Sequence, residues 1–440
     1  MEAKIKLPKG NWEERTHRIL EGFLSKYASP EGTPSCKRHY AVLDCDDTIT
    51  FNDSEYVLDQ YALSHLRLAL PPEAWGKALT NGIPASLLQK PLPEGYSLED
   101  LVEDAVEAYR FLYQKGYVQE EGGNAVCQKD DPHSLEFRAK AYAYLLKASE
   151  LLSPMKASLL WAYPFAGFHP QDYRELAKEA HRYHANAIQG IQRTVWTSPN
   201  LPSRAGVIHV SLDEEFGIVP EMRDLLLALR RANIDVYIVS ASTKEEVDSL
   251  FDPPEFALPS MAGVFGVELK EKNGVYLPEA KDPALPISCG PGKSDVVSSF
   301  LCPRYEGRGP SFVAGDGALD FYLATEFKDT RLVLHPNVGK KNRSSLLKAV
   351  ALDQAKRGYD LENYRDTLYL LQGRDYPKKR FLKGVDSYVL GQKEPIKAVA
   401  LAQEELSLLE KGMDYKTLFQ QGDERYPEVG LPPYRGYHNR

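Results

Sequence analysis

The sequence predicts an α/β fold, with a Rossmann-like core around a parallel sheet and a large helical cap inserted after the first strand. Three observations lead to this prediction. Short apolar strands alternate with helices from about residue 207 to residue 340, which is the pattern of a parallel sheet covered on both faces. One more strand of this kind, Tyr40-Ala41-Val42-Leu43, lies far upstream. Residues 53–206, which separate the two parts, have a mostly helical pattern.

The composition is that of a globular protein. The chain has 440 residues, of which 43% are apolar and 26% charged, so it can bury a large core in more than one domain. Its 54 basic and 62 acidic residues give a net charge of −8, which argues against a broad nucleic-acid surface but allows a pocket for a small anion. No apolar run approaches the roughly 20 residues that span a bilayer, and the N-terminus lacks the apolar centre of a signal peptide. We expect a cytoplasmic protein with neither membrane nor nucleic acid as a partner, and the oligomeric state stays open.

The chain divides into four predicted parts. Residues 1–37 form an N-terminal segment that packs on the core, with a helix at 11–28 whose apolar stripe runs from Trp12 to Leu24. The core comprises 38–52 and 207–345, the cap 53–206, and a mostly helical C-terminal extension 346–440. The five cysteines form no C-x-x-C pair, so we expect reduced thiols rather than disulfides or a structural zinc site.

Strands and helices follow each other in the second part of the core. We expect strands at 205–212, 235–242, 311–316 and 330–336, and a pair of strands within 261–278 around the turn Asn273-Gly274. We expect helices at 219–234, 243–251, 294–301 and 319–326, the first with Pro220 in its first turn. A helical insertion in such a fold usually covers the crevice at the carboxyl ends of the strands.

Four segments carry polar groups at the ends of apolar strands. They are Asp44-Cys45-Asp46-Asp47-Thr48, Ser240-Ala241, Gly292-Lys293-Ser294, and Gly315-Asp316-Gly317 with Asp320. Because the carboxyl ends of parallel strands converge on one edge, we expect these segments to lie together. Neighbouring carboxylates repel each other unless a cation lies between them. Asp44 and Asp316, with a backbone carbonyl from the first loop, offer the oxygen ligands that Mg²⁺ prefers.

The remaining groups indicate phosphoryl chemistry. Lys293, Ser240 and the loop at Ala241 suit the binding of an anion next to the cation, and such a site works by positioning and charge neutralisation. Asp44 would be the nucleophile, and Asp46 the general acid and base. Two residues keep alternative interpretations. Thr48 either orients the Asp44 carboxylate or caps a turn. Asp320 contacts the metal through water, braces Lys293 or only starts a helix.

These segments, in this order, resemble the four motifs of the haloacid dehalogenase (HAD) superfamily. The resemblance implies a Rossmann-like core, magnesium, and hydrolysis of phosphate esters through a phosphoaspartate. The cap position resembles the phosphoserine-phosphatase-like branch, and "PFAGFHPQDYRELAKEA" with "VPEMRDLLLALRRANIDVYIVSAS" resembles phosphorylcholine-phosphatase-like proteins. Several of those proteins carry a signal peptide, and this chain shows none. The matching residues are Asp44, Asp46 and Thr48 in the first motif, Ser240 in the second, Lys293 in the third, and Asp316 and Asp320 in the fourth, with Asp44, Asp46, Asp316 and Asp320 as the implied metal site.

The cap should select the leaving group. In that branch an acidic residue near the entrance to the cap domain contacts the substrate amine, and Asp53 and Glu55 stand at this place in the sequence. Asp53 would also suit the N-cap position of the helix that follows. The aromatic residues Trp161, Tyr163, Phe165 and Phe168 are interpreted either as cap core or as a box for a quaternary ammonium. His181 and His184 are interpreted either as core histidines or as a metal pair.

The predicted function is a magnesium-dependent phosphatase acting on a small phosphorylated metabolite such as phosphocholine, phosphoethanolamine or phosphoserine. One alternative is a phosphotransferase that uses the same site. An alternative of another class is a catalytically silent binding protein with a HAD fold, but the intact set of motif residues argues against it.

Overall fold

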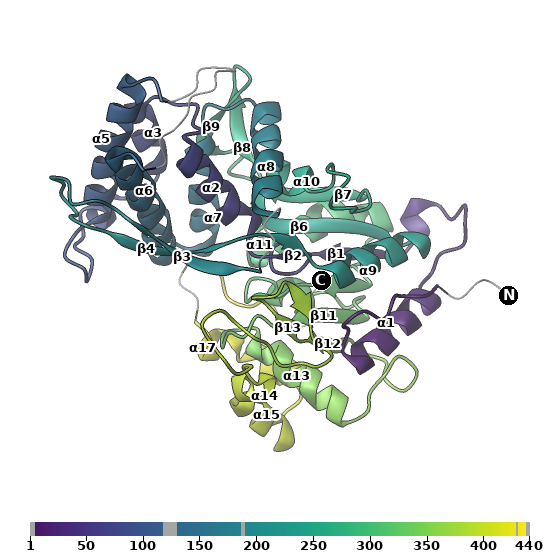
Figure 1. Cartoon of the computed structure of the whole chain (residues 1–440). Coiled ribbons are helices and arrows are strands. Elements are labelled where there is room, and N and C mark those ends of the chain that lie inside the picture. Colours follow the sequence, from purple (N-terminus) through teal and green to yellow (C-terminus); the bar gives the residue numbers. More distant parts are fainter. Residues whose placement is uncertain (1–4, 118–129, 186–189, 428–429, 437–440) are drawn as a thin grey trace.

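A six-stranded parallel sheet forms the centre of the protein. The computed structural model describes residues 5–117, 130–185, 190–427 and 430–436. The strand order is β12-β11-β10-β1-β6-β7, and every neighbouring pair is parallel. The α/β fold class and the helical insertion after the first strand are therefore confirmed (Figure 1). The strands are β1 (Tyr40–Leu43), β6 (Asp235–Thr243), β7 (Gly263–Val267), β10 (Phe312–Ala314), β11 (Leu332–Pro336) and β12 (Leu368–Gln372).

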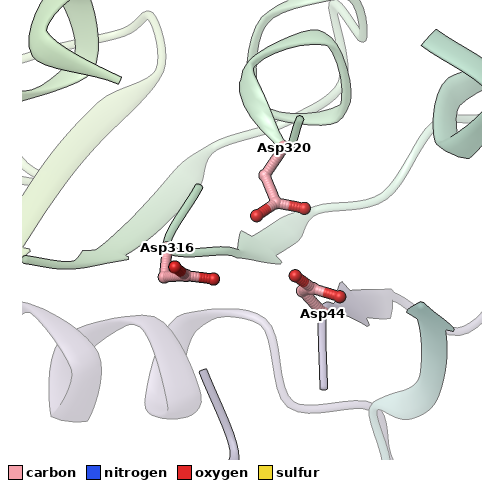
Figure 2. A group of neighbouring side chains, drawn as sticks. All are labelled: Asp44, Asp316 and Asp320. Carbon is pink, nitrogen blue, oxygen red and sulfur yellow. The ribbon is translucent and has the colours of Figure 1, made fainter. Parts of the chain in front are cut away.

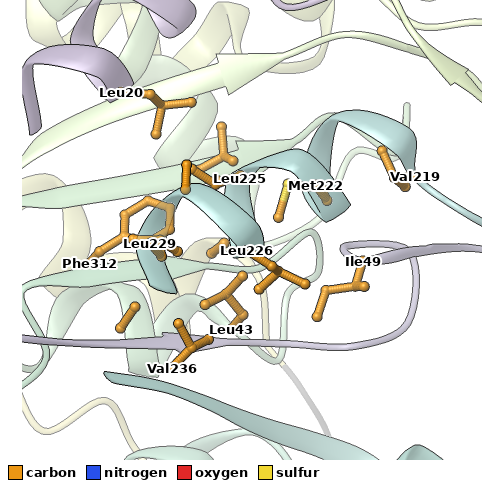
Figure 3. Packing of buried hydrophobic residues seen from close by; sticks show 14 of the residues in the cluster. Leu20, Leu43, Ile49, Val219, Met222, Leu225, Leu226, Leu229, Val236 and Phe312 are labelled. Carbon is orange, nitrogen blue, oxygen red and sulfur yellow. The ribbon is translucent and has the colours of Figure 1, made fainter. Parts of the chain in front are cut away.

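Helices cover both faces of this sheet, and β1 shows why. Ala41 and Leu43 point into one apolar cluster, and Tyr40 and Val42 into another, because successive side chains of a strand face opposite sides. The first cluster includes residues of α1 (Glu14–Lys26) and α9 (Pro220–Arg231), and Figure 3 shows Leu20 of α1 beside Leu225 of α9, with Leu226 nearer to Leu43. The second cluster includes α13 (Ser345–Lys356), α15 (Gln403–Glu410) and α16 (Tyr415–Gln420).

The cap has an apolar core of its own, built around residues such as Trp75, Tyr109 and Phe137. Figure 1 shows its helices grouped on one side of the sheet, away from the C-terminal helices. They are α2 (Ser54–His65), α3 (Pro72–Leu79), α4 (Ala85–Leu88), α5 (Leu98–Gln114), α6 (Pro132–Leu151), α7 (Pro154–Ala162), η2 (Tyr163–Phe165) and α8 (Pro170–Ala185).

Two antiparallel ribbons complete the cap. One joins β3 (Gln192–Thr197) to β4 (His209–Glu214), and the other joins β8 (Leu269–Lys272) to β9 (Val275–Ala280) through the predicted Asn273-Gly274 turn. The strand predicted at 205–212 is thus real, but it does not belong to the central sheet. Val210 and Leu212 are buried while His209 and Ser211 are exposed, and such alternation fits a ribbon with one covered face rather than a central parallel strand.

The C-terminal extension contributes more than helices. Its strand β12 forms one edge of the central sheet, and it adds the short ribbon of β13 (Arg374–Asp375) and β14 (Arg380–Phe381). The apolar run Leu368–Leu371 was missed as a strand because a short continuous run has no diagnostic period. The other elements are β2 (Thr50–Phe51), β5 (Gly217–Ile218), α10 (Lys244–Ser249), α11 (Pro291–Val296), α12 (Phe321–Thr325), α14 (Ala398–Leu401), α17 (Gly422–Arg425), η1 (Ser35–Lys37), η3 (Val297–Leu301) and η4 (Cys302–Tyr305).

No helix among the described residues is long and apolar enough to cross a membrane.

Candidate active site

Three carboxylates meet at the carboxyl edge of the sheet. Asp44 follows β1, and its N–H donates to Ala314 O of β10 (2.9 Å), so the ends of the two strands are held together. Asp316 and Asp320 follow β10. Each of the three side chains offers an oxygen, and these oxygens lie within 4.8 Å of one another. Figure 2 shows the three side chains pointing toward one another. Such a hard oxygen set fits one divalent cation of the magnesium type.

Lys293 lies beside the same carboxylates. Its Nζ is 2.7 Å from Asp44 Oδ1 and 2.6 Å from Asp320 Oδ1, and the side chain is buried. Burial lowers the pKa of Lys293, but the Asp320 and Asp44 carboxylates outweigh burial and raise it, so the ammonium stays charged. Of the alternatives for Asp320, bracing Lys293 is what the geometry shows, and the same carboxylate also belongs to the acidic trio.

Glycines allow these close approaches. A Cβ on Gly315 would lie 2.5 Å from Asp320 Cγ, so a larger residue would displace the carboxylate that braces the lysine. A Cβ on Gly292 would lie 1.8 Å from Ile287 O. Side chains at 315 and 292 would therefore disturb the fourth and third motifs, respectively.

The trio is electrostatically unfavourable without a cation. Burial raises the pKa of Asp44, Asp320 raises it further, and Lys293 only partly opposes them. Burial, followed by the carboxylates of Asp47 and Asp320, raises the pKa of Asp316 to about 8. The raised pKa values reflect the repulsion between buried carboxylates, which a divalent cation would relieve.

The Asp46 carboxylate forms hydrogen bonds with Ser54 and Ser242 rather than with the residues of the trio. Its Oδ1 accepts from Ser54 N–H (2.8 Å) at the start of α2, and its Oδ2 accepts from the Ser242 hydroxyl (2.7 Å). The carboxylate therefore does not join the group formed by Asp44, Asp316 and Asp320. Burial raises the pKa of Asp46, although the hydrogen bonds from Ser54 and Ser242 oppose the shift. A carboxyl that holds its proton more tightly than usual suits a general acid.

Thr48 does not contact Asp44. Its N–H donates to Cys45 O (3.2 Å), as in a turn, and its hydroxyl donates to Asp316 Oδ1 (3.4 Å). Of the two interpretations from the sequence, the turn is what the structure shows, and the carboxylate that Thr48 orients is Asp316. Cys45 is buried in the apolar cluster beneath the loop, as an apolar filler would be.

A cavity of about 600 Å³ opens in front of these groups, between the sheet and the cap. Ser240 and Ala241 line it, and Ser240 Oγ accepts from Ser242 N–H (3.2 Å). Ser242 was not singled out from the sequence, although its place two residues after Ser240 puts both side chains on the same side of the strand. The predicted residues that line the cavity are Asp44, Asp46, Asp53, Glu55, Ser240, Ala241, Lys293, Asp316 and Asp320. Thr48 is buried and does not line it.

Sequence reasoning missed the rest of the wall. Tyr56 and Tyr142 come from the cap helices, Arg193 and Asp213 from the β3–β4 ribbon, and Lys340 from the loop after β11. No spacing in the sequence could have joined these residues, because they belong to elements that meet only through the packing of the cap on the sheet.

Asp53 caps the helix that follows it and also lines the cavity. Its Oδ1 caps α2 by accepting from Glu55 N–H (3.0 Å) and Tyr56 N–H (3.3 Å), and the side chain also lines the cavity. Burial and the Asp46 and Glu246 carboxylates raise the pKa of Asp53. Burial, Glu246 and Asp53 raise the pKa of Glu55 in the same way. A cation in the cavity would allow both groups to ionise.

Of the two interpretations of the aromatic residues Trp161, Tyr163, Phe165 and Phe168, the structure shows the cap core. Trp161, Tyr163 and Phe165 are buried in the cap core and do not line the cavity, and the cap aromatics that do are Tyr56 and Tyr142. Residues 161–165 are buried because α7 and η2 pack against the apolar cap core.

The histidine pair belongs to the protein interior. Burial lowers the pKa of His181 to about 3 and that of His184 to about 4, so both rings are neutral. His181 stacks on Phe216, with 5.2 Å between the ring centroids. In the part of the chain that the structure describes, neither histidine joins a group of three metal-ligating side chains.

The fold and the site together define an α/β protein whose helical cap covers a carboxylate-and-lysine site at the edge of a parallel sheet. No protein-family model and no curated protein matches the sequence. Among solved structures, the chain is similar to a conserved, functionally unknown protein from Anaerococcus prevotii DSM 20548. The identity is 21%, the TM-score is 0.73, and the match covers 89% of this chain and 100% of that chain. This likeness shows a shared fold.

Two weaker likenesses are to a protein of unknown function from Bordetella pertussis Tohama I and to a phosphoserine phosphohydrolase-like protein from Francisella tularensis subsp. tularensis SCHU S4. The first has 13% identity and a TM-score of 0.35, covering 74% of this chain and 97% of that chain. The second has 12% identity and a TM-score of 0.29, covering 68% of this chain and 87% of that chain. TM-scores this low do not show that either protein shares the fold of this chain.

Proposed function

We propose that the chain is a HAD-like, magnesium-dependent phosphatase that hydrolyses a small phosphomonoester. One observation carries the proposal. Lys293 bridges Asp44 and Asp320, and these two carboxylates together with Asp316 form a group that fits a divalent cation. A single point that offers both a cation site and a fixed ammonium can bind the two sides of a phosphate.

Asp44, Asp316 and Asp320 would hold the magnesium ion, which would neutralise phosphate charge when bound. Lys293 would bind a phosphate oxygen and keep the Asp44 carboxylate in place, and Ser240 with the loop at Ala241 would bind the other oxygens. The raised pKa values of Asp44 and Asp316 imply that metal binding would displace protons.

The reaction would run in two steps. An Asp44 oxygen forms a bond to phosphorus, the bond from phosphorus to the ester oxygen breaks, and the leaving oxygen takes the proton from Asp46. Water then attacks the phosphoaspartate while Asp46 takes a proton from the water. The bond between phosphorus and the Asp44 oxygen breaks, which releases phosphate and restores the carboxylate.

The residues on the cap side of the cavity favour a substrate whose leaving group carries a positive charge. Asp53 and Glu55 line the cavity there, and the Tyr56 and Tyr142 rings provide faces for an ammonium group. Phosphocholine, phosphoethanolamine and phosphoserine all carry such a group. A phosphotransferase would use the same residues but would pass the phosphoryl group to an alcohol instead of water.

A screen of phosphomonoesters with magnesium tests the proposal, with chelator and Asp44→Asn as matched negative controls. We expect phosphate release that needs the metal and disappears in the variant. Release that persists in excess chelator, or in Asp44→Asn, would contradict it. An added alcohol acceptor distinguishes the two enzymes, because a phosphotransferase would form the new ester in preference to free phosphate. A silent binding protein would release no phosphate from any of the esters.

A further inference from the structure

Arg374, from the C-terminal extension, contacts the first-motif loop. Its side chain is 4% exposed, and its Nη1 donates to both Asp47 O (2.9 Å) and Asp47 Oδ1 (3.0 Å). Two rings flank the guanidinium, with its carbon 5.8 Å from the centroid of Phe51 and 5.1 Å from that of Tyr376. Arg374 itself does not line the cavity.

The loop that Arg374 contacts has an unfavourable backbone. Asp47 and Asn52 both have left-handed φ angles, 55° and 68°. Asp and Asn adopt this conformation at less cost than other residues apart from glycine, and contacts with neighbouring structure fix it here. Tyr376, two residues after Arg374, donates from its hydroxyl to Asn52 Oδ1 (3.2 Å). One short segment therefore holds both left-handed residues of the loop.

Arg374 also completes the charge balance of the loop. Asp44 has Lys293, and Asp46 has the Ser54 N–H and the Ser242 hydroxyl. Asp47 is the third acid of the motif, and Arg374 is its partner. Without the guanidinium, the Asp47 carbonyl and carboxylate would both lose the contact that fixes this part of the loop.

The segment is firmly attached to the rest of the extension. Arg374 N–H donates to Ser387 Oγ (3.0 Å), and Tyr388 N–H donates to Arg374 O (2.9 Å). A Cβ at Gly373 would lie 2.2 Å from Asp386 O, so the chain packs here with no room for a side chain. The support behind Arg374 is thus a fixed piece of backbone.

We propose that Arg374 is a positioning residue, and that the C-terminal extension uses it to hold the Asp44–Thr48 loop in the conformation that binds the metal and presents Asp44 for attack. This inference rests on the proposed phosphatase function. It assigns the extension a part in the reaction, although no residue of β13 touches the trio. Because Arg374 lies outside the cavity, its loss should lower kcat and metal affinity and leave KM nearly unchanged.

The test compares Arg374→Met with Arg380→Met, a control on the same ribbon whose side chain is 51% exposed and pairs with Asp375. In Arg374→Met we expect kcat and the affinity for Mn²⁺ alone, measured by calorimetry, to fall by about 10–100-fold. The expected change in KM is under about threefold, and the control should match the native protein. In Arg374→Ala, low concentrations of guanidinium should restore part of the lost Mn²⁺ affinity, and equal sodium chloride should not.

Two results would overturn the inference: native Mn²⁺ affinity in Arg374→Met, or a loss in Arg374→Ala that guanidinium does not reverse. The second result would mean that the substitution only damages the fold. If the native protein hydrolyses no phosphomonoester, the proposed function fails, yet the Mn²⁺ measurements still decide the role of Arg374. Absence of Mn²⁺ binding by the native protein would overturn both.

Discussion

Asp316→Asn should destroy metal-dependent activity and yet stabilise the metal-free protein. The substitution removes a charge that the empty site tolerates poorly and keeps an oxygen that can accept from the Thr48 hydroxyl. Burial and the neighbouring acids raise the pKa of Asp316 from its ordinary 3.8 to about 8. The folded protein therefore holds this proton more tightly than the unfolded chain does.

The magnitude follows from this shift. The folded protein still holds this proton at pH 7, which is about three pH units above the unfolded-state pKa of 3.8. Each unit corresponds to about 1.4 kcal/mol, or about 4 kcal/mol in all. Asp316 is only partly buried, and the solvent in the cavity screens its charge. We therefore expect a gain of about 1–2 kcal/mol in the free energy of unfolding. Because the folded-state pKa is raised, this cost of Asp316 grows as the pH rises from about 4 to about 8, so the gain should vanish at about pH 4.

Denaturant unfolding in chelator, at several pH values, measures this gain. Magnesium should stabilise the native protein and not the variant. Asp360→Asn is the control, because hydrogen bonds from the Glu362 and Asn363 N–H groups lower the pKa of that carboxyl, and its loss should give no stabilisation. A variant at position 316 that is less stable than the native protein in chelator, or equally stabilised at all pH values, would refute the reasoning.

The remaining predictions concern catalysis. Asp44→Asn should retain the fold and form no acid-stable phosphoprotein, and near-native turnover would exclude a covalent mechanism on this residue. Asp46→Asn should slow both half-reactions by about 10²–10⁴-fold, as rapid-quench kinetics would show, and an unchanged rate would assign the acid elsewhere. Calcium should inhibit, because its larger and looser coordination shell would misplace the attacking oxygen, and activation by calcium in a metal titration would contradict this. Asp53→Asn should lower kcat/KM for phosphocholine, phosphoethanolamine and phosphoserine relative to glycerol phosphate, and an unchanged ranking would show that this carboxylate does not select the leaving group.

Much of the sheet and the floor of the cavity could be predicted from the sequence. The strands at 40–43, 235–242, 311–316 and 330–336 are continuous apolar runs between clear breakers, and such local signals survive folding. The meeting of Asp44 and Asp316 also followed from sequence, since topology forces the ends of parallel strands onto one edge. Asp44 and Asp316 are 272 residues apart in the chain, yet β1 and β10 are neighbours in the sheet.

The errors have a common physical origin. Whether the strand at 209–214 joins the sheet or the cap depends on which apolar surface it covers, and its own residues do not specify that surface. The cap aromatics at 161–165 have the composition of a ligand box, and only their packing shows that they are cap core. The orientation of Asp46 depends on Ser54 and Ser242, which come from two other elements.

The sequence by itself determined the α/β class, the inserted cap and the acidic strand ends, because backbone periodicity and the identity of the charged residues are local properties. Only the tertiary structure decided which partner each acid has: Lys293 for Asp44 and Asp320, the α2 N-terminus for Asp46, and Arg374 for Asp47. Electrostatic energies and hydrogen bonds depend on distances of a few ångströms, and segments far apart in the chain reach such distances only through the packing of the sheet, the cap and the C-terminal extension.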